Sequence, residues 1–241
     1  KINCKVIMGD TDSFCLYSNS QFNPTTPCDI SEEYINNMYV RDKVISNKLI
    51  KLELEKKIDK MIIFGSEEIN IKKKYVELSE GKLKLTGLDS IKSDTQAIAR
   101  DLQVNLVDYI INNEFPDRMG LKTIIEKYKL KFNKAISEKD YKYIAIPSKI
   151  NKDANMYLKD SMSVKAIKDS KIMIAVNERF YILKGINVNC AFKSLNDIPK
   201  DFKIDLEAMW ERIINKTEIF LNLFPGKKEV FTGHPTLIKW A

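Results

Sequence analysis

The sequence predicts an α+β fold in which antiparallel hairpins precede a mainly helical region. Up to residue 89, short runs of β-branched, aromatic and apolar residues alternate with turn residues, which is typical of hairpins. After residue 93, apolar residues recur every three or four positions, which is typical of packed helices. The chain has 241 residues, 44% of them hydrophobic, enough for one large or two small domains. We place the boundary between 1–94 and 95–241.

Residues 2–18 predict a β-hairpin that carries two carboxylates at its tip, Asp10 and Asp12. Two close carboxylates repel each other, and Mg²⁺ relieves that repulsion because oxygen ligands suit it. The spacing alone also fits an ordinary turn, or the Asp-x-Asp metal site of nucleotide-sugar glycosyltransferases. A calcium-binding EF-hand is excluded, because Phe14 and Gln21 stand where its loop needs oxygen ligands.

The rest of the first region predicts one helix and several strands. The helix follows a cap at Asp29 or Ser31 and runs to about residue 51. The strands are expected over residues 52–56, 61–64, 69–78 and 82–89. In a strand, Lys73 and Tyr75 would share one face, suited to a phosphate or a base-pair edge; a basic edge strand that discourages aggregation explains them equally well.

The second region predicts three helices and a hairpin. A capping box, Ser93-x-x-Gln96, begins the first helix, and the second covers residues 121–136. Two apolar runs flanking residues 176–179 predict the hairpin, which spans 172–183. Asp205 caps the last helix, whose apolar stripe we assign to the core.

The charge is unevenly distributed along the chain. The formal net charge is +7, yet residues 1–60 hold nine basic and nine acidic residues. Residues 122–152 hold nine lysines and three acids. This run fits a solvated helix face or a surface that follows phosphates.

Composition also excludes several classes of protein. The four cysteines form no C-x-x-C pair and the only histidine is His234, which argues against a zinc site. Free cysteines in apolar strands favour a reducing compartment, so we expect a cytoplasmic protein. No apolar run approaches the roughly 20 residues of a membrane helix, and no membrane partner is expected.

Four segments, in one order, resemble the motifs of family B DNA polymerases. Gly9-Asp10-Thr11-Asp12-Ser13 matches the G-D-T-D-S motif C, and Leu52–Lys56 resembles the L-E-F-E-K segment. Lys72-Lys73-Lys74-Tyr75 is similar to the K-K-R-Y motif, and Lys84–Asp94 to the segment joining palm to thumb. The amino-acid sequence of this last segment most resembles replicative polymerases of tailed phages. That resemblance would place the protein in the cytoplasm of an infected host cell.

The resemblance implies a role for each matched residue. Asp12 would be the principal ligand of two Mg²⁺ ions, which Mn²⁺ can replace, with Asp10 assisting and Glu55 close behind. Residues 1–94 would belong to the palm and 95–241 to the thumb. The residues expected to contact primer–template DNA are Lys72, Lys73, Tyr75, Lys84, Lys92, Lys129 and Lys131.

Parts of the family pattern are altered or missing. Met8 replaces the usual aromatic residue and Asp89 the usual Glu. The second catalytic Asp motif, the fingers helix that grips dNTP and the exonuclease carboxylates should lie upstream, so we expect an N-terminal polymerase portion as a partner. A sliding clamp is a further candidate partner, although residues 235–241 are not a convincing clamp peptide. The alternative to half a catalytic site is a non-catalytic DNA-binding module with a vestigial acidic hairpin.

Overall fold

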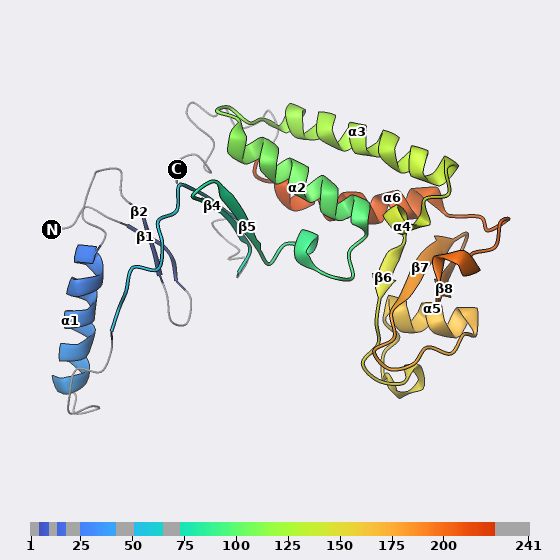
Figure 1. Ribbon diagram of the computed structural model, residues 1–241, viewed down its shortest axis with the longest axis horizontal. Helices are drawn as coiled ribbons and strands as arrows, with labels where there is room; N and C mark the ends of the chain where they lie inside the picture. The colour runs from blue at the N-terminus through green and yellow to red at the C-terminus, as the bar shows by residue number, and fades with distance from the viewer. Residues whose placement is uncertain (1–4, 10–13, 18–24, 42–50, 65–72, 225–241) are drawn as a thin grey trace.

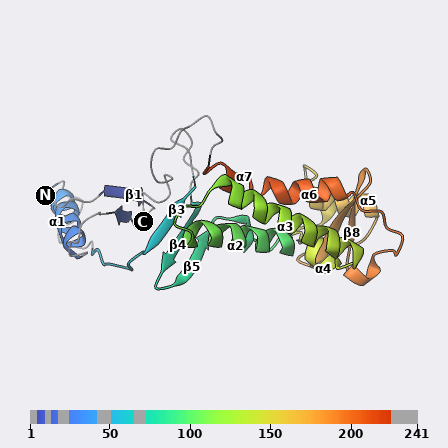
Figure 2. The same ribbon diagram turned by 90° about the horizontal axis from the view of Figure 1, so that it is seen from above.

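The computed structural model describes residues 5–9, 14–17, 25–41, 51–64 and 73–224, and it confirms the α+β class (Figure 1). Three antiparallel sheets are formed by these residues, in the orders β1-β2, β3-β4-β5 and β6-β7-β8. In two perpendicular views, helix α1 lies at the opposite end of an elongated molecule from β6–β8 (Figures 1 and 2). No helix within the described ranges is both long and apolar enough to cross a bilayer.

The predicted first hairpin is present. Strand β1 (Lys5–Gly9) pairs antiparallel with β2 (Phe14–Tyr17). Helix α1 (Thr25–Arg41) follows, but it begins before both predicted caps, Asp29 and Ser31. The prediction of a cap was therefore wrong, because the polar composition of residues 18–28 suggested a longer loop.

The second sheet contains β3 (Lys60–Ile63), β4 (Tyr75–Ser79) and β5 (Lys82–Thr86). Strands β4 and β5 are joined at Glu80 and Gly81, whose φ angles of 50° and 71° suit a tight hairpin turn. The described part of the strand predicted over 69–78 begins only at Tyr75. Lys73 has a φ of 61°, a left-handed conformation that does not continue a strand.

Residues 51–58 form no regular element, so the strand predicted over 52–56 is absent. Leu52-Glu53-Leu54-Glu55 has the alternation of a strand, but no neighbouring strand pairs with it. Single contacts hold the segment instead. The Ser79 hydroxyl donates to the Lys57 carbonyl at 2.5 Å, and the Asp59 N–H donates to the Leu78 carbonyl at 2.8 Å.

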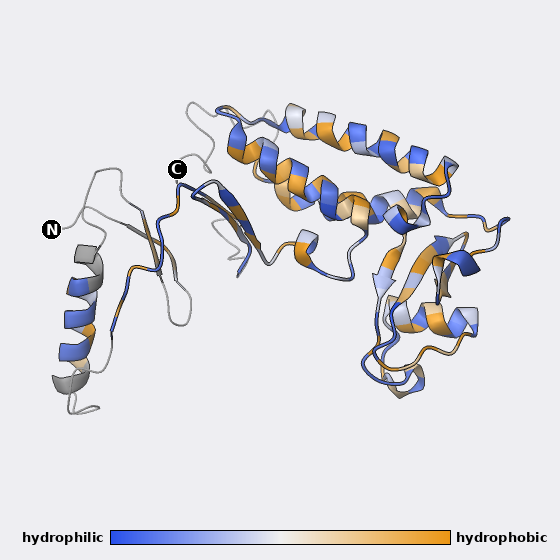
Figure 3. Ribbon diagram, viewed as in Figure 1, coloured by the Kyte–Doolittle hydropathy of each residue, from blue (hydrophilic) through white to orange (hydrophobic). Residues whose placement is uncertain are grey.

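A short turn of 3₁₀ helix, η1 (Asp89–Ile91), leads from the sheet to the helices α2 (Ala97–Asn112) and α3 (Arg118–Ser137), which lie side by side (Figure 2). Hydrophobic and hydrophilic residues alternate along both helices, as expected when each buries one stripe (Figure 3). The predicted inner face of α2 is buried in full: Ile98, Leu102, Leu106 and Ile110.

The predicted capping box of α2 was wrong. Gln96 is itself the N-cap, and its side chain makes no cap hydrogen bond. Its buried amide instead donates to the Ile144 carbonyl at 2.9 Å, so a distant partner fixes this side chain. Helix α3 does have a local cap, since the Asp117 carboxylate accepts from the Gly120 N–H at 2.8 Å.

The third sheet and its helices follow. Helix α4 (Tyr141–Ile144) leads into β6 (Ile146–Ser148), and the turn η2 (Ala154–Met156) precedes α5 (Met162–Ser170), which packs on the sheet. Strands β7 (Phe180–Gly185) and β8 (Val188–Phe192) complete the sheet. The predicted hairpin was misplaced: Ile172–Ala175 is not a strand, and the turn lies at Ile186 and Asn187, where Asn187 has a φ of 62°.

The chain then returns to the helices. After the turn η3 (Leu195–Asp197), helix α6 (Leu206–Asn215) begins at the predicted cap, where the Asp205 carboxylate accepts from the Ala208 N–H at 3.0 Å. Helix α7 (Glu218–Leu221) follows. The predicted apolar stripe is largely correct, with Met209, Ile213 and Phe220 buried, but Leu206 is 43% exposed.

One core joins the β3–β5 sheet to the helices. The ring of Phe64, directly after β3, meets the ring of Phe220 edge to face with centroids 5.2 Å apart. Val76 and Leu88 belong to the same buried cluster as α2 and α3. Side chains from both sides of the predicted boundary at residue 94 therefore share this core, and the boundary itself stays a prediction.

We expect Phe64→Ala to lower the free energy of unfolding by about 3–5 kcal/mol, because it empties a fully buried site between the sheet and α7. Denaturant unfolding followed by circular dichroism measures this. Leu158→Ala is the matched control: Leu158 is 101% exposed, and its loss should change stability by less than about 0.5 kcal/mol. Equal effects of the two substitutions would contradict a shared core at Phe64.

Candidate nucleic-acid interface

The β1–β2 hairpin carries the predicted metal ligands in its connection. Met8 pairs with Cys15 and Gly9 pairs with Phe14, so the two strands are matched up to the last described residue on each side. Asp10 and Asp12 fall in the interval between Gly9 and Phe14, outside the described residues. Their role as metal ligands stays a prediction.

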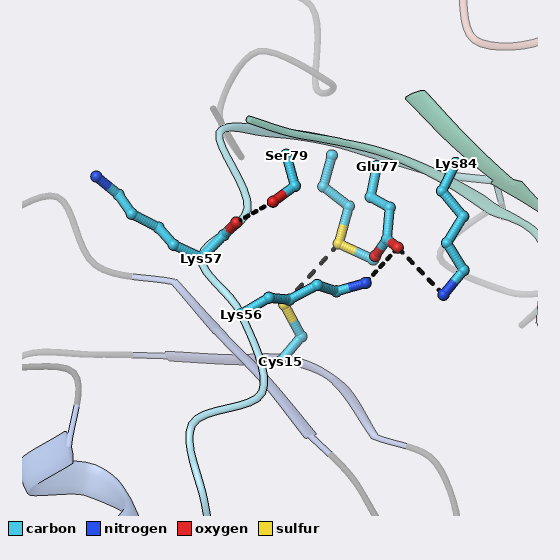
Figure 4. A network of polar contacts seen from close by, with 7 residues as sticks. Cys15, Lys56, Lys57, Glu77, Ser79 and Lys84 are labelled. Carbon is cyan, nitrogen blue, oxygen red and sulfur yellow. Dashed lines mark hydrogen bonds and ion pairs between the residues drawn. The ribbon is translucent and has the colours of Figure 1, made fainter. Parts of the chain in front are cut away.

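The hairpin is attached to the β3–β5 sheet through sulfur atoms. The Cys15 thiol lies 3.9 Å from the Met61 sulfur (Figure 4). Burial raises the pKa of Cys15, and the nearby Glu77 carboxylate raises it further. The thiol therefore stays protonated at neutral pH and acts as a packing group rather than a nucleophile.

Glu77 is the centre of a polar network under this hairpin. It lies on β4, is 4% exposed, and forms ion pairs with Lys56 and, at 3.4 Å, with Lys84 (Figure 4). The hydrogen bond to Glu77 raises the pKa of Lys56. A buried carboxylate is costly without cationic partners, so Lys56 and Lys84 have a structural role in stabilising Glu77. Lys84, a predicted DNA contact, still has a side chain that is 62% exposed.

Glu55, the third predicted metal ligand, lies on the irregular segment directly before Lys56. Its side chain is exposed, and no hydrogen bond or ion pair is formed by it among the described residues. Glu53 is different, because its carboxylate pairs with Lys51 on the surface. An exposed carboxylate is compatible with a role in binding a cation, and the assignment of Glu55 as a metal ligand stays a prediction.

The predicted DNA contacts Lys73 and Tyr75 do not share a strand face, because Lys73 precedes β4 in a left-handed turn. Lys73 is exposed, whereas Tyr75 is half-buried and pairs with Ile63 and Thr86. Lys72 lies outside the described residues. The prediction that strand alternation places Lys73 and Tyr75 on one face was therefore wrong. Neither side chain is fully buried, so both remain accessible to a binding partner.

Gly87 holds this turn against the segment that leaves β5. Its φ is +69°, and a Cβ atom placed there would lie 2.0 Å from the Lys73 carbonyl oxygen. Only glycine allows this approach, which places the turn at Lys73 beside the segment that leads to η1. These two resembling motifs are thus in direct backbone contact.

Lys92, on the segment joining sheet to helices, pairs with Asp89 at 2.7 Å. Its hydrogen bond to Asp89 raises the pKa of Lys92. Next to them, the Lys216 ammonium donates to the Thr95 hydroxyl at 2.9 Å. This connecting segment is therefore tied to the end of α6 by side chains that local sequence patterns do not reveal.

The two predicted lysines of α3 differ in their surroundings. Lys129 is half-buried and lies over the ring of Trp210, 4.7 Å from its centroid, and burial lowers its pKa. Lys131 is exposed and lies over the ring of Tyr128 at 4.1 Å. With Lys127 and Lys134, Lys131 forms an exposed stripe at helical spacing, which we call the α3 stripe. The stripe is exposed, although the Lys134 ammonium also pairs with the Glu138 carboxylate at 3.7 Å.

Within the described ranges, no group of three or more His, Cys, Asp or Glu side chains could hold a metal ion. That search does not include Asp10 and Asp12. The network missed by sequence reasoning is the pairing of Lys56 with Glu77. No local sequence signal points to it, because strand alternation places Glu77 on the face of β4 opposite Val76 and Leu78, a face that the pattern assigns to solvent.

No protein-family profile and no curated protein sequence matches this chain. Among solved structures, the chain is similar to the family B DNA polymerase of the hyperthermophilic archaeon Pyrobaculum calidifontis, with a TM-score of 0.54 over 94% of this chain and 14% sequence identity. The fold of this chain is similar to that of part of this polymerase. The chain spans 28% of the length of that polymerase.

Gly87→Ala and Gly81→Ala form a matched pair of variants. Both glycines have positive φ, but nothing lies within 4 Å of a Cβ at Gly81. We expect Gly81→Ala to cost about 1 kcal/mol of stability, and Gly87→Ala to cost roughly twice that or more, because it also separates two backbone segments. Thermal or urea unfolding of both variants measures the difference. Equal losses would show that the contact between Gly87 and Lys73 is unimportant.

For the Glu77 network, we expect Lys56→Met to destabilise the protein more than Glu77→Gln. The first leaves a buried carboxylate with only the more distant Lys84, at a cost of about 2–4 kcal/mol. The second lets both lysines turn toward water, at a cost of about 1 kcal/mol. Urea unfolding of both variants and of the double variant Lys56→Met/Glu77→Met gives the comparison, with the double variant expected to recover much of the loss. A larger loss for Glu77→Gln would refute the argument.

Proposed function

We propose that this chain is the C-terminal palm and thumb portion of a DNA-directed DNA polymerase, which adds dNTPs to a primer 3′ end. The observation that carries the proposal is the similarity in fold to a family B DNA polymerase over 94% of the chain. The ordered motifs support it independently. Fold similarity alone leaves the activity open. The order of the segments G-D-T-D-S, L-E-L-E-K and K-K-K-Y, which is that of the polymerase family, is additional support for polymerase activity.

In this proposal, Asp10 and Asp12 bind two divalent cations and Glu55 lies near them. Two bound Mg²⁺ ions would activate the primer 3′-oxygen and stabilise the leaving pyrophosphate. Carboxylate oxygens are suitable ligands for Mg²⁺, and the exposed side chain of Glu55 is consistent with this donor set. The described residues would help to position Glu55: the ion pair between Lys56 and Glu77 holds the segment on which Glu55 lies.

The α3 stripe is proposed to bind the backbone of the primer–template duplex. Its lysines are exposed, and phosphate contacts of this kind fix position without reading sequence. Tyr75, half-buried beside the exposed Lys73, is proposed to contact the duplex near the primer end. Because this chain spans 28% of the similar polymerase, we propose that the dNTP-gripping fingers and the rest of the palm come from an N-terminal polymerase portion.

The test is primer extension by the chain supplied with that N-terminal portion. We expect extension that needs Mg²⁺ and is restored by Mn²⁺ after treatment with a chelator. Asp12→Asn should reduce extension by at least about a thousandfold, since it removes the charge that binds the metal. Duplex binding, measured by a gel-shift salt series, should remain within about twofold, because Asp12 contacts no phosphate directly in this scheme.

Asp29→Asn is the matched control, since Asp29 is an exposed acid on α1 outside the proposed site. It should leave extension unchanged. Near-normal extension by the Asp12→Asn complex would refute the assignment of the metal ligand. Salt-sensitive duplex binding with no extension under any metal would favour a non-catalytic DNA-binding module.

A further inference from the structure

One face of α6 is lined by polar and charged side chains and faces the third sheet. Ala208, Arg212 and Lys216 follow one another at intervals of four residues, so they lie on one side of the helix. Glu211 and Asn215 lie beside them. In Figure 1, α6 lies close to β6 and β7. The side chains of Ala208, Glu211, Arg212, Asn215 and Lys216 line a cavity whose other lining residues include members of the sheet. We call this cavity the α6 pocket.

The sheet contributes the opposite wall. Lys184 on β7 and Asn189 on β8 are cross-strand partners, so their side chains lie together on one face of the hairpin. Ile146 on β6, together with Met162 and Met209, supplies an apolar surface. The pocket has a volume of about 540 Å³ and is open to solvent. That size is within the range of small-ligand sites and exceeds the needs of a single phosphate.

The α6 pocket holds three cations and one acid. In the part of the chain that the structure describes, no carboxylate lies within 4.0 Å of Lys184, Arg212 or Lys216. Glu211 also lines the pocket, yet it pairs with none of them. The lining residues therefore carry an excess of two positive charges, while Asp89 and Asp94, which do not line the pocket, lie close enough to act electrostatically on Arg212 and Lys216.

Arg212 is the most unusual of these side chains. Its Nε atom is buried and has no hydrogen-bond acceptor among the described residues. Its Nη1 atom donates only to the Met162 sulfur, a weak acceptor, at 3.2 Å. Burial lowers the pKa of both Arg212 and Lys216, so their charges carry a desolvation cost, which the carboxylates of Asp89 and Asp94 offset in part. The C-terminus of α6 offsets some of that cost through its dipole, but a dipole does not satisfy a buried N–H group.

We propose that the α6 pocket binds the phosphate of a nucleotide unit, with Arg212, Lys216 and Lys184 around the phosphate. The guanidinium offers planar paired donors that match phosphate oxygens. The sugar or base would lie against Ile146, Met162 and Met209, and the Asn189 and Asn215 amides can hydrogen-bond polar edges. A free nucleotide and a nucleotide within a single strand share this chemistry. The site involves neither the carboxylates of the β1–β2 hairpin nor the α3 stripe.

Titrations of the full chain test this proposal, with deoxyadenosine monophosphate and a fluorescent single-stranded oligonucleotide as two arms. We expect Arg212→Gln to weaken binding in at least one arm by about tenfold, and Arg212→Lys to weaken it less, because one charge is kept but the paired donors are lost. Lys203→Gln is the matched control: Lys203 is exposed and does not line the pocket. It should bind like the wild type.

A loss in the monophosphate arm identifies free nucleotides as ligands, and a loss only in the oligonucleotide arm identifies a strand. Should Arg212→Gln fail to fold by circular dichroism, Asn189→Leu replaces it, since it fills the pocket from the sheet side and should cause the same loss. Equal binding by wild type and pocket variants in both arms would overturn the proposal. Primer extension is not a readout here, so this result is separate from the outcome for Asp12.

Discussion

The structure depends on burial of one face of the β3–β5 sheet against the helices. A three-stranded sheet of this size has little core of its own, and it needs a partner layer to remain folded. Phe64 supplies that contact through the ring of Phe220 on α7, more than 150 residues further along the chain. The Lys60 ammonium adds a hydrogen bond to the Ile111 carbonyl at 2.7 Å, at the end of α2. Both contacts place the sheet directly against the helices.

This packing also explains why the connecting segment carries so many specific contacts. Between β5 and α2 the chain must turn away from the sheet without leaving its polar groups unsatisfied. Gly87 allows the turn at Lys73, Asp89 pairs with Lys92, and Thr95 accepts from Lys216. The segment is therefore held by the sheet at one end and by α6 at the other. These contacts give the residues of the segment Lys84–Asp94 a structural role, in addition to the proposed functional role of the motif that the segment resembles.

Local sequence patterns predicted the elements that are stabilised locally. The buried stripe of α2 and the Asp205 cap of α6 are examples, because periodicity and a short-range hydrogen bond determine them. The strand expected over residues 52–56 shows the opposite case. Its alternation was sufficient for a strand, but a strand also needs a partner, and neither outer strand of the β3-β4-β5 sheet pairs with this segment among the described residues. Gln96 was misread for the same reason, since its partner is the distant Ile144 carbonyl.

The same distinction applies to the candidate site. The carboxylates and lysines of the motifs could be named from the sequence, because their order and spacing carry the signal. The partners of Glu77 and the members of the α6 pocket could not, because residues such as Lys184 and Arg212 meet only after the third sheet has packed on α6. No pattern of 10 to 20 residues contains both of them.

Knowledge of these partners changes how the positive charge should be interpreted. A lysine count treats all of residues 122–152 alike, but Lys129 lies half-buried on Trp210, whereas Lys131 is exposed. Lys56 and Lys92 are paired with carboxylates, and a paired cation contributes little net attraction for phosphate. The positive surface that remains free is therefore smaller than the +7 of the chain suggests. Two parts of it, the α3 stripe and the α6 pocket, differ in kind: exposed side chains can follow a flexible backbone, whereas half-buried donors favour one phosphate in one position.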